Sequence, residues 1–209
     1  MTVPSKIKFF MKKRSAILIA LASLLMIGSL FTPLWDITLE APQYPEGLGM
    51  KIWLAKLSGD VSTISGLNHY IGMKAISEDM FPEFGYMKGI VIAIIISGLL
   101  VAVIRKKWLF AFWFLSFLII AALGVYDFWL WEYDYGHNLD PRAAIKVPGM
   151  SYQPPLIGCT ELLNFYACSF PSIGGWLIVV SGTTSFLVFL DEFFLGRIKR
   201  ERTTKVVPA

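Results

Sequence analysis

Charged residues are scarce in this sequence. Asp, Glu, Lys and Arg together make up 16% of its 209 residues, whereas 56% are hydrophobic. A soluble globule of this size needs more polar surface than such a chain provides. The basic residues also do not form a stripe with interleaved aromatic side chains on a soluble face, which is the footprint of nucleic-acid binding. The composition therefore indicates a membrane protein in contact with the lipid bilayer and argues against a nucleic-acid partner.

Motifs that carry catalysis are missing as well. The sequence contains no Ser-His-Asp order, no glycine-rich phosphate loop, no HExxH and no CxxC. The cores of its apolar runs contain no ionisable residue, so the buried relay of a proton-coupled transporter is also missing. We therefore predict that the chain is not an enzyme, and we assign it no catalytic residue.

Four long apolar runs dominate the sequence: residues 15–35, 88–104, 108–126 and 173–192. A helix rises about 1.5 Å per residue, so runs of this length approach the ~30 Å hydrocarbon core of a bilayer. Backbone groups in lipid must be hydrogen-bonded within their own segment, and the runs lack the alternation of barrel strands. The predicted fold class is therefore an all-α integral membrane protein with four transmembrane helices.

The positions of the basic residues predict the orientation. Thirteen of the nineteen Lys and Arg residues lie in three segments, residues 1–14, 105–107 and 193–209. By the positive-inside rule these segments are cytoplasmic, so both termini are predicted inside. Residues 36–87 and 127–172 are then extracytoplasmic loops, which we expect to form one small cap. The predicted location is a bacterial inner membrane with both large loops in the periplasm.

Only two cysteines are present, Cys159 and Cys168, and both lie in the second predicted loop. In an oxidising compartment two cysteines nine residues apart commonly pair, and such a bridge contributes roughly 2–3 kcal/mol in the chain-entropy picture. A continuous helix over residues 159–168 would hold the thiols too far apart, so pairing requires a bend. A disulfide, two packed free thiols, and metal ligation or thiol exchange are all compatible with the sequence.

Soft metal ligands are concentrated in the two predicted loops. Thioether and imidazole groups suit copper, and in an oxidising compartment methionine persists as a Cu(I) ligand where a free thiolate does not. His69 and Met73 are four residues apart and would share one face of a helix. The alternative is that the methionines fill apolar gaps and that each histidine has a structural role. The candidate ligands are His69, Met73, Met80, Met87, His137 and Met150.

Three stretches resemble an uncharacterised family of bacterial inner-membrane proteins. They are residues 36–49 (DITLEAPQYPEGLG), 66–74 (GLNHYIGMK) and 133–165 (YDYGHNLDPRAAIKVPGMSYQPPLIGCTELLNF). That family is associated with clusters for nitrous oxide reductase maturation in Bacteroidetes-like organisms. The resemblance implies copper supply to, or assembly of, an extracytoplasmic copper enzyme.

The predicted function is that of a non-enzymatic accessory protein for extracytoplasmic copper handling, or for maturation of a copper respiratory enzyme of the nitrous oxide reductase type used in denitrification. Copper is its candidate cofactor, and a copper chaperone, a reductase or a transporter complex is its expected partner. The alternative is a structural subunit or assembly factor of a membrane respiratory or transport complex that binds no metal. A quinone-linked redox subunit is disfavoured, because the apolar runs contain no paired histidines to hold haem.

Overall fold

The computed structural model describes residues 9–195, so residues 1–8 and 196–209 of the two predicted basic termini lie outside the described residues. The chain divides into two compact units. The helical unit comprises the described residues up to Ile27, Val91–Ile120, and the described residues from Leu177 onward. The sheet unit comprises Gly28–Ile90 and Ala121–Trp176. Each unit therefore combines segments that are far apart in the sequence.

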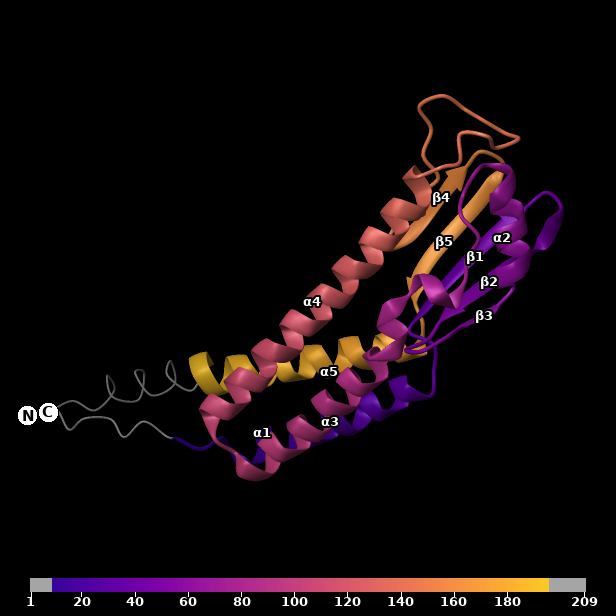
Figure 1. The fold of residues 1–209 in the computed structure, drawn as a ribbon. Helices are drawn as coiled ribbons and strands as arrows, with labels where there is room; N and C mark the ends of the chain where they lie inside the picture. The colour runs from indigo at the N-terminus through magenta and orange to yellow at the C-terminus, as the bar shows by residue number, and fades with distance from the viewer. Residues whose placement is uncertain (1–8, 196–209) are drawn as a thin grey trace, which may run out of the picture. The chain divides into compact units, whose positions relative to one another are not determined.

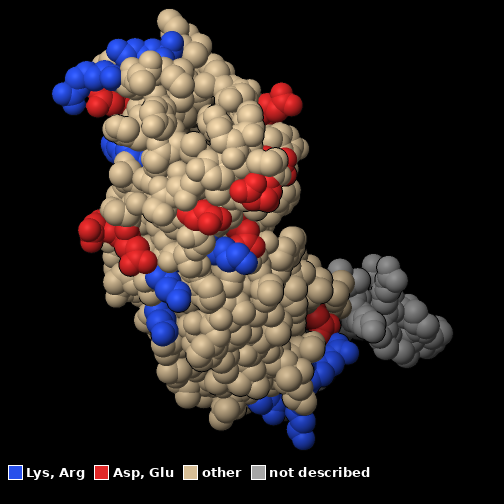
Figure 2. Space-filling view, turned by 90° about the vertical axis from the view of Figure 1, so that its right-hand side faces the viewer, with Lys and Arg blue, Asp and Glu red and all other residues tan. Residues whose placement is uncertain are grey.

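Within residues 9–195, four helices are long and apolar enough to cross a membrane. They are α1 (Lys13–Leu25) with the 3-10 turn Met26–Leu30, α3 (Met87–Ile104), α4 (Lys107–His137), and α5 (Ile173–Leu190) with the π-helical turn Asp191–Leu195 (Figure 1). They lie at the four predicted apolar runs. Figure 2 shows a broad surface without Lys, Arg, Asp or Glu side chains, as expected for helices that face lipid. The protein is thus a membrane protein with four candidate spans.

Small residues let the helices of the helical unit approach each other closely. A Cβ added to Gly98 in α3 would lie 2.3 Å from the Ser23 hydroxyl in α1 and 2.8 Å from the Trp113 ring in α4. In α5, the Ser181 hydroxyl lies 2.9 Å from the carbonyl oxygen of Ala22 and donates to it. Close packing and hydrogen bonds of this kind hold helices together in lipid, where burial of apolar surface provides little driving force.

A buried carboxylate connects three segments of the helical unit. The side chain of Glu192 is completely buried, and Lys107 Nζ lies 2.8 Å from its Oε2 atom, an ion-pair distance. Its Oε1 atom accepts hydrogen bonds from the backbone N–H of Lys12 at 2.8 Å and from the Ser15 hydroxyl at 2.7 Å. Glu192 therefore ties the start of α1 and the start of α4 to the turn that follows α5.

The segments between the candidate spans form a five-stranded antiparallel sheet in the order β3-β2-β1-β5-β4. Its strands are β1 (Trp35–Ala41), β2 (Tyr44–Ile52), β3 (Leu57–Gly59), β4 (Gly158–Leu162) and β5 (Phe165–Pro171) (Figure 1). The central strand β1 pairs with β2 on one side and with β5 on the other. The two segments, which are separated by α3 and α4, therefore build one sheet.

Alternation of apolar and polar residues explains the central strand. Along β1, Ile37, Leu39 and Ala41 are buried, whereas Thr38 and Glu40 between them are exposed. Successive side chains of a strand point to opposite faces of a sheet, so one face of β1 is buried and the other is open. An antiparallel sheet with one covered and one open face has this pattern.

The covered face of the sheet carries the core of the sheet unit. Helix α2 (Val61–Tyr70) contributes Ile64 to this core, and the C-terminal part of α4 contributes Tyr135. The ring centroids of Trp35 on β1 and Phe128 on α4 lie 5.2 Å apart. Burial of such large aromatic and aliphatic side chains is the main stabilising contribution to a unit of this size.

The prediction of an all-α fold is wrong. Residues 36–87 and 127–172, predicted as two loops, both contribute strands to the sheet. Frequent Gly and Pro residues predict loops, but here many of these residues lie within or between short strands. The third predicted span also continues beyond residue 126 to His137, and its 31 residues correspond to roughly 46 Å of helix. The C-terminal part of this helix, from Ala121 onward, belongs to the sheet unit.

Candidate functional site

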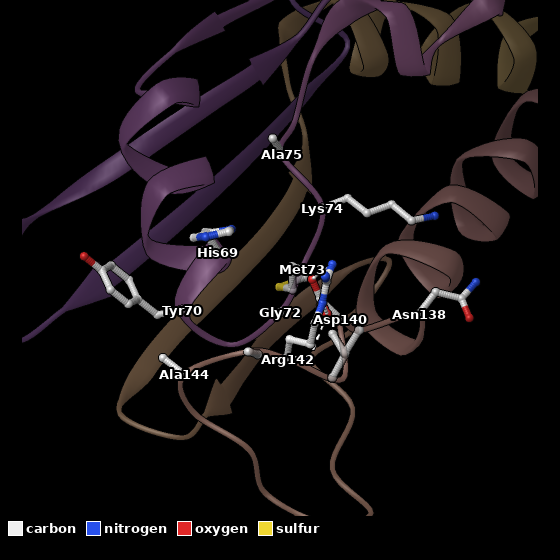
Figure 3. Close-up of a pocket in the computed structure, with 12 residues that line it drawn as sticks. His69, Tyr70, Gly72, Met73, Lys74, Ala75, Asn138, Asp140, Arg142 and Ala144 are labelled. Atoms are coloured by element: carbon white, nitrogen blue, oxygen red, sulfur yellow. Dashed lines mark hydrogen bonds and ion pairs between the residues drawn. The ribbon is translucent and has the colours of Figure 1, made fainter.

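A cavity of about 510 Å³ lies in the sheet unit. Its two walls are residues 69–75, at and after the end of α2, and residues 138–144, which follow α4 (Figure 3). Soft, basic and acidic side chains line it together: His69, Met73, Lys74, Asp140 and Arg142. A concave site with several convergent polar groups is the default candidate for ligand binding.

Backbone hydrogen bonds hold the two walls of this pocket together. The N–H of Asp140 donates to the carbonyl oxygen of Gly72 at 2.8 Å, and the N–H of Ile145 donates to that of Tyr70 at 2.9 Å. Gly72 adopts a φ of +86°, and a Cβ there would lie 3.0 Å from backbone atoms of Asp140. Only glycine accepts this conformation and this close approach without strain. Gly72 therefore determines how closely the walls meet.

Two exposed ion pairs carry most of the charge at the pocket. Lys74 Nζ lies 2.9 Å from Oδ2 of Asp134, and Arg142 Nε lies 3.3 Å from Oδ1 of Asp140. Asp134 also accepts a hydrogen bond from the side-chain amide of Asn138. Because all four charged side chains are exposed, these pairs contribute little to stability. Their main effect is to orient the polar groups around the cavity.

Asp140 is expected to stay ionised below the pH range in which aspartates ordinarily titrate. The backbone N–H and the guanidinium of Arg142 hold the pKa of Asp140 below its usual value, and the positive charge of His69 acts in the same direction. Because the folded-state pKa is depressed, the contribution of ionised Asp140 to the stability of the folded protein is present above the ordinary pKa. It is lost as the pH falls through the folded-state value.

Carboxyl NMR titration should show that Arg142→Gln raises the pKa of Asp140, because the substitution removes the guanidinium beside the carboxylate. An unchanged pKa of Asp140 would contradict the assignment.

The structure places two of the six predicted metal ligands at this pocket. His69 is exposed at the C-terminal end of α2, and Met73, which is 6% exposed, lies beyond that end (Figure 3). The helix stops at Tyr70, so the helical relation predicted for the two residues does not apply. Instead Gly72 terminates the helix in a Schellman motif, in which the N–H of Met73 donates to the carbonyl oxygen of Asn68 at 3.0 Å. This turn places Met73 next to the pocket.

The other four predicted ligands do not line the pocket. The His137 ring stacks on Tyr133 with centroids 4.0 Å apart, and its Nδ1 atom lies 2.9 Å from the Tyr133 carbonyl oxygen. Met80 packs against the core, Met87 begins α3, and Met150 is exposed in the segment between α4 and β4. Among the described residues, no group of three or more His, Cys, Asp or Glu side chains is arranged to hold a metal ion.

The two cysteines form a disulfide across a hairpin. Cys159 in β4 and Cys168 in β5 are directly opposite, with Cα atoms 4.0 Å apart. The bend that pairing requires is the two-residue turn between the strands, where Leu163 has a φ of +61°. Residues 159–168 therefore form two strands rather than the continuous helix that would have kept the thiols apart.

Sequence reasoning missed the second wall of the pocket and one buried acid. Residues 138–144 reach the pocket through long-range backbone contacts, and their only local signal is the Asp140-Pro141 turn dipeptide. Glu132 in α4 is completely buried in the sheet unit, and neither of its carboxyl oxygens has a hydrogen-bond partner among the described residues. It does not line the pocket.

These features define a class: a membrane protein with four candidate spans and a disulfide-bonded unit of sheet and helix that carries a polar pocket. Comparison of the chain with protein-family models, with curated proteins and with solved structures found no match. The function is therefore inferred from the residues of this chain.

Proposed function

We propose that the protein is a non-enzymatic accessory protein of a bacterial inner membrane that binds Cu(I) in the pocket of its sheet unit. The observation that carries the proposal is that an imidazole and a thioether, those of His69 and Met73, line one cavity. These are ligand types that copper prefers. The resemblance of residues 66–74 to a family associated with nitrous oxide reductase maturation supports the same metal.

The proposed orientation places the sheet unit in the periplasm. Along the sequence, each candidate span separates a basic segment (residues 1–14, 105–107 or 193–209) from a segment that contributes to the sheet unit. By the positive-inside rule the basic segments are cytoplasmic, so the sheet unit is on the other side of the membrane. The disulfide of the sheet unit supports this orientation, because disulfides persist in oxidising compartments. The pocket would then face extracytoplasmic copper proteins.

Two protein ligands suit transfer of copper better than its storage. His69 is exposed and offers an imidazole nitrogen at the surface, while Met73, which is 6% exposed, offers a flexible thioether to the same cavity. A site with two ligands leaves coordination positions on Cu(I) open for a donor or an acceptor protein. We propose that a copper chaperone or the copper enzyme itself fills these positions during transfer.

Copper titration of the detergent-purified full chain tests the proposal. Cu(I) is kept reduced with ascorbate, which leaves the disulfide intact, and bicinchoninate competes for the ion. We expect one saturable equivalent in the wild type, and affinity weaker by about tenfold or more in His69→Ala and in Met73→Leu. Met73→Leu conserves volume, so its fold should persist.

The matched controls are His137→Ala and Met150→Leu, which remove the same ligand types at positions away from the pocket. Both should bind Cu(I) like the wild type. The proposal fails if the wild type shows no saturable binding at micromolar Cu(I), or if the control variants lose as much affinity as the pocket variants.

A second function, an assembly factor that binds no metal, is favoured by the open face of the sheet. Tyr166 and Phe170 on β5 are 43% and 46% exposed there, and exposed aromatic residues are enriched where proteins bind one another. A stable complex that copurifies equally well from the wild type and from His69→Ala, with and without a copper chelator, would support this function over copper transfer.

A further inference from the structure

The disulfide lies on the open face of the sheet. Ala167 and Ser169 are buried on the covered face, so Cys168 between them points to the opposite side. Cys168 is half-buried, and Cys159 on the edge strand β4 is exposed. A dithiol reagent or a thiol-bearing protein can therefore reach the bond without opening the core.

Strand pairing on both sides of β5 holds the hairpin in addition to this bond. Five residue pairs, from Gly158 opposite Ser169 to Leu162 opposite Phe165, join β4 to β5. Strand β5 is held on its other side by six pairs with β1. Because strand pairing already fixes the register, reduction should leave the two thiols facing each other.

The register places the two cysteines where opposite side chains come closest. Pairs in an antiparallel hairpin alternate between hydrogen-bonded and non-hydrogen-bonded types, beginning with a hydrogen-bonded pair beside a two-residue turn. Leu162 and Phe165 form that first pair, so Cys159 and Cys168, three pairs further on, are of the non-hydrogen-bonded type. Two sulfur atoms at such a pair can take one ion between them with little movement of the backbone.

We propose that Cys159 and Cys168, once reduced, form a second Cu(I) site with two thiolate ligands on the open face of the sheet. The oxidation state of the cysteine pair then decides whether this site exists. The inference rests on the proposed function only in assuming that Cu(I) reaches the sheet unit; its ligands are independent of His69 and Met73.

The chemistry balances in two steps. A dithiol reductant of the thiol–disulfide oxidoreductase class attacks the bond through a mixed disulfide, supplies two electrons and two protons, and becomes a disulfide itself. Cys159 and Cys168 become thiols. Binding of Cu(I) then releases the two thiol protons and forms two copper–sulfur bonds without a change in the oxidation state of copper.

The number of ligands selects the metal. Zinc in a structural site requires four protein ligands, and the described residues contain no group of three or more His, Cys, Asp or Glu that could hold a metal. Two soft thiolates suit Cu(I). Glu161 lies two residues from Cys159 on the same face of β4, so its charge favours a cation there.

The test compares the oxidised and the reduced full chain in detergent without oxygen. Dithiothreitol reduces the bond and is removed by desalting, and mass measurement after alkylation confirms two free thiols. In Cu(I) titration against bicinchoninate, the reduced wild type should bind one equivalent more than the oxidised form. His69→Ala/Met73→Leu should still gain this equivalent on reduction, whereas Cys159→Ser/Cys168→Ser should not gain it.

X-ray absorption on reduced His69→Ala/Met73→Leu should show copper with two sulfur neighbours. Equal binding by both redox forms, a gain that survives in Cys159→Ser/Cys168→Ser, or unfolding of the sheet unit on reduction would overturn the inference. Absence of binding by the oxidised protein would remove only the His69–Met73 site, so the two proposals fail separately.

Discussion

Replacing Lys107 by Met is expected to destabilise the protein by about 3–5 kcal/mol, because it leaves a buried carboxylate without its counter-ion. Lys107 Nζ lies 2.8 Å from Glu192, whose side chain is completely buried. Met has nearly the same length as Lys, so the substitution removes the charge while keeping most of the packing. The measurement is the midpoint of thermal unfolding in detergent, followed by circular dichroism.

The control is Arg14→Met, which removes an ion pair at the same end of the helical unit. Arg14 lies 3.0 Å from Asp191, but its side chain is 68% exposed, and an exposed pair contributes at most about 1 kcal/mol. Lys107→Met/Glu192→Gln should recover most of the stability, since both charges are then absent. A Lys107→Met variant as stable as Arg14→Met would show that Glu192 does not depend on this cation.

Gly136→Ala is expected to cost about 1–3 kcal/mol by overpacking. A Cβ at this position in α4 would lie 2.5 Å from the backbone nitrogen of Gln153 and 2.6 Å from its Cα. The segment that includes Gln153 would have to move away from α4, and the hydrogen bond at 2.9 Å from the N–H of Tyr152 to the carbonyl oxygen of Gly136 would lengthen. The thermal midpoint should fall by about 2–4 °C for each kcal/mol.

Gly124→Ala is the matched control in the same helix. A Cβ at Gly124 would meet nothing within 4 Å, and Ala favours a helix over Gly by up to about 1 kcal/mol. This variant should be as stable as the wild type or slightly more stable. If both Ala variants behave alike, the close approach of residues 151–154 to α4 is not present in the protein.

The spans could be predicted from the sequence, but the sheet was missed despite a visible signal. Length and absence of charge are sufficient to identify a long apolar helix. In β1, residues 35–41 (WDITLEA) alternate apolar and polar side chains, which is the ordinary pattern of a half-buried strand. Strand β5 is harder to predict from the sequence, because Tyr166, Cys168 and Phe170 on its open face are also apolar. The β4–β5 turn is hidden further by Leu163, a residue type that rarely adopts positive φ.

Half of the candidate pocket was accessible to sequence reasoning. His69 and Met73 are close in the sequence, so their proximity could be predicted, although the reason is a glycine-terminated helix end and not a shared helix face. Lys74 directly follows Met73 in the sequence and lines the same pocket. Asp140 and Arg142 reach the same cavity only because α4 continues to His137 and returns the chain to Gly72. No local pattern predicts such a long-range crossing, and none indicated that Met80, Met87, His137 and Met150 would lie elsewhere.

The strand order of the sheet has a consequence for biosynthesis. The ribosome makes β1 early and β5 late, although Asp36 and Phe170 are directly paired in the finished protein. Until residues 158–171 emerge, one side of β1 is an unpaired edge, and such edges recruit strands from other chains. Pairing between residues so distant in the sequence is also slow. A nascent chain that stalls after α4 therefore exposes a strand edge of the kind that promotes aggregation.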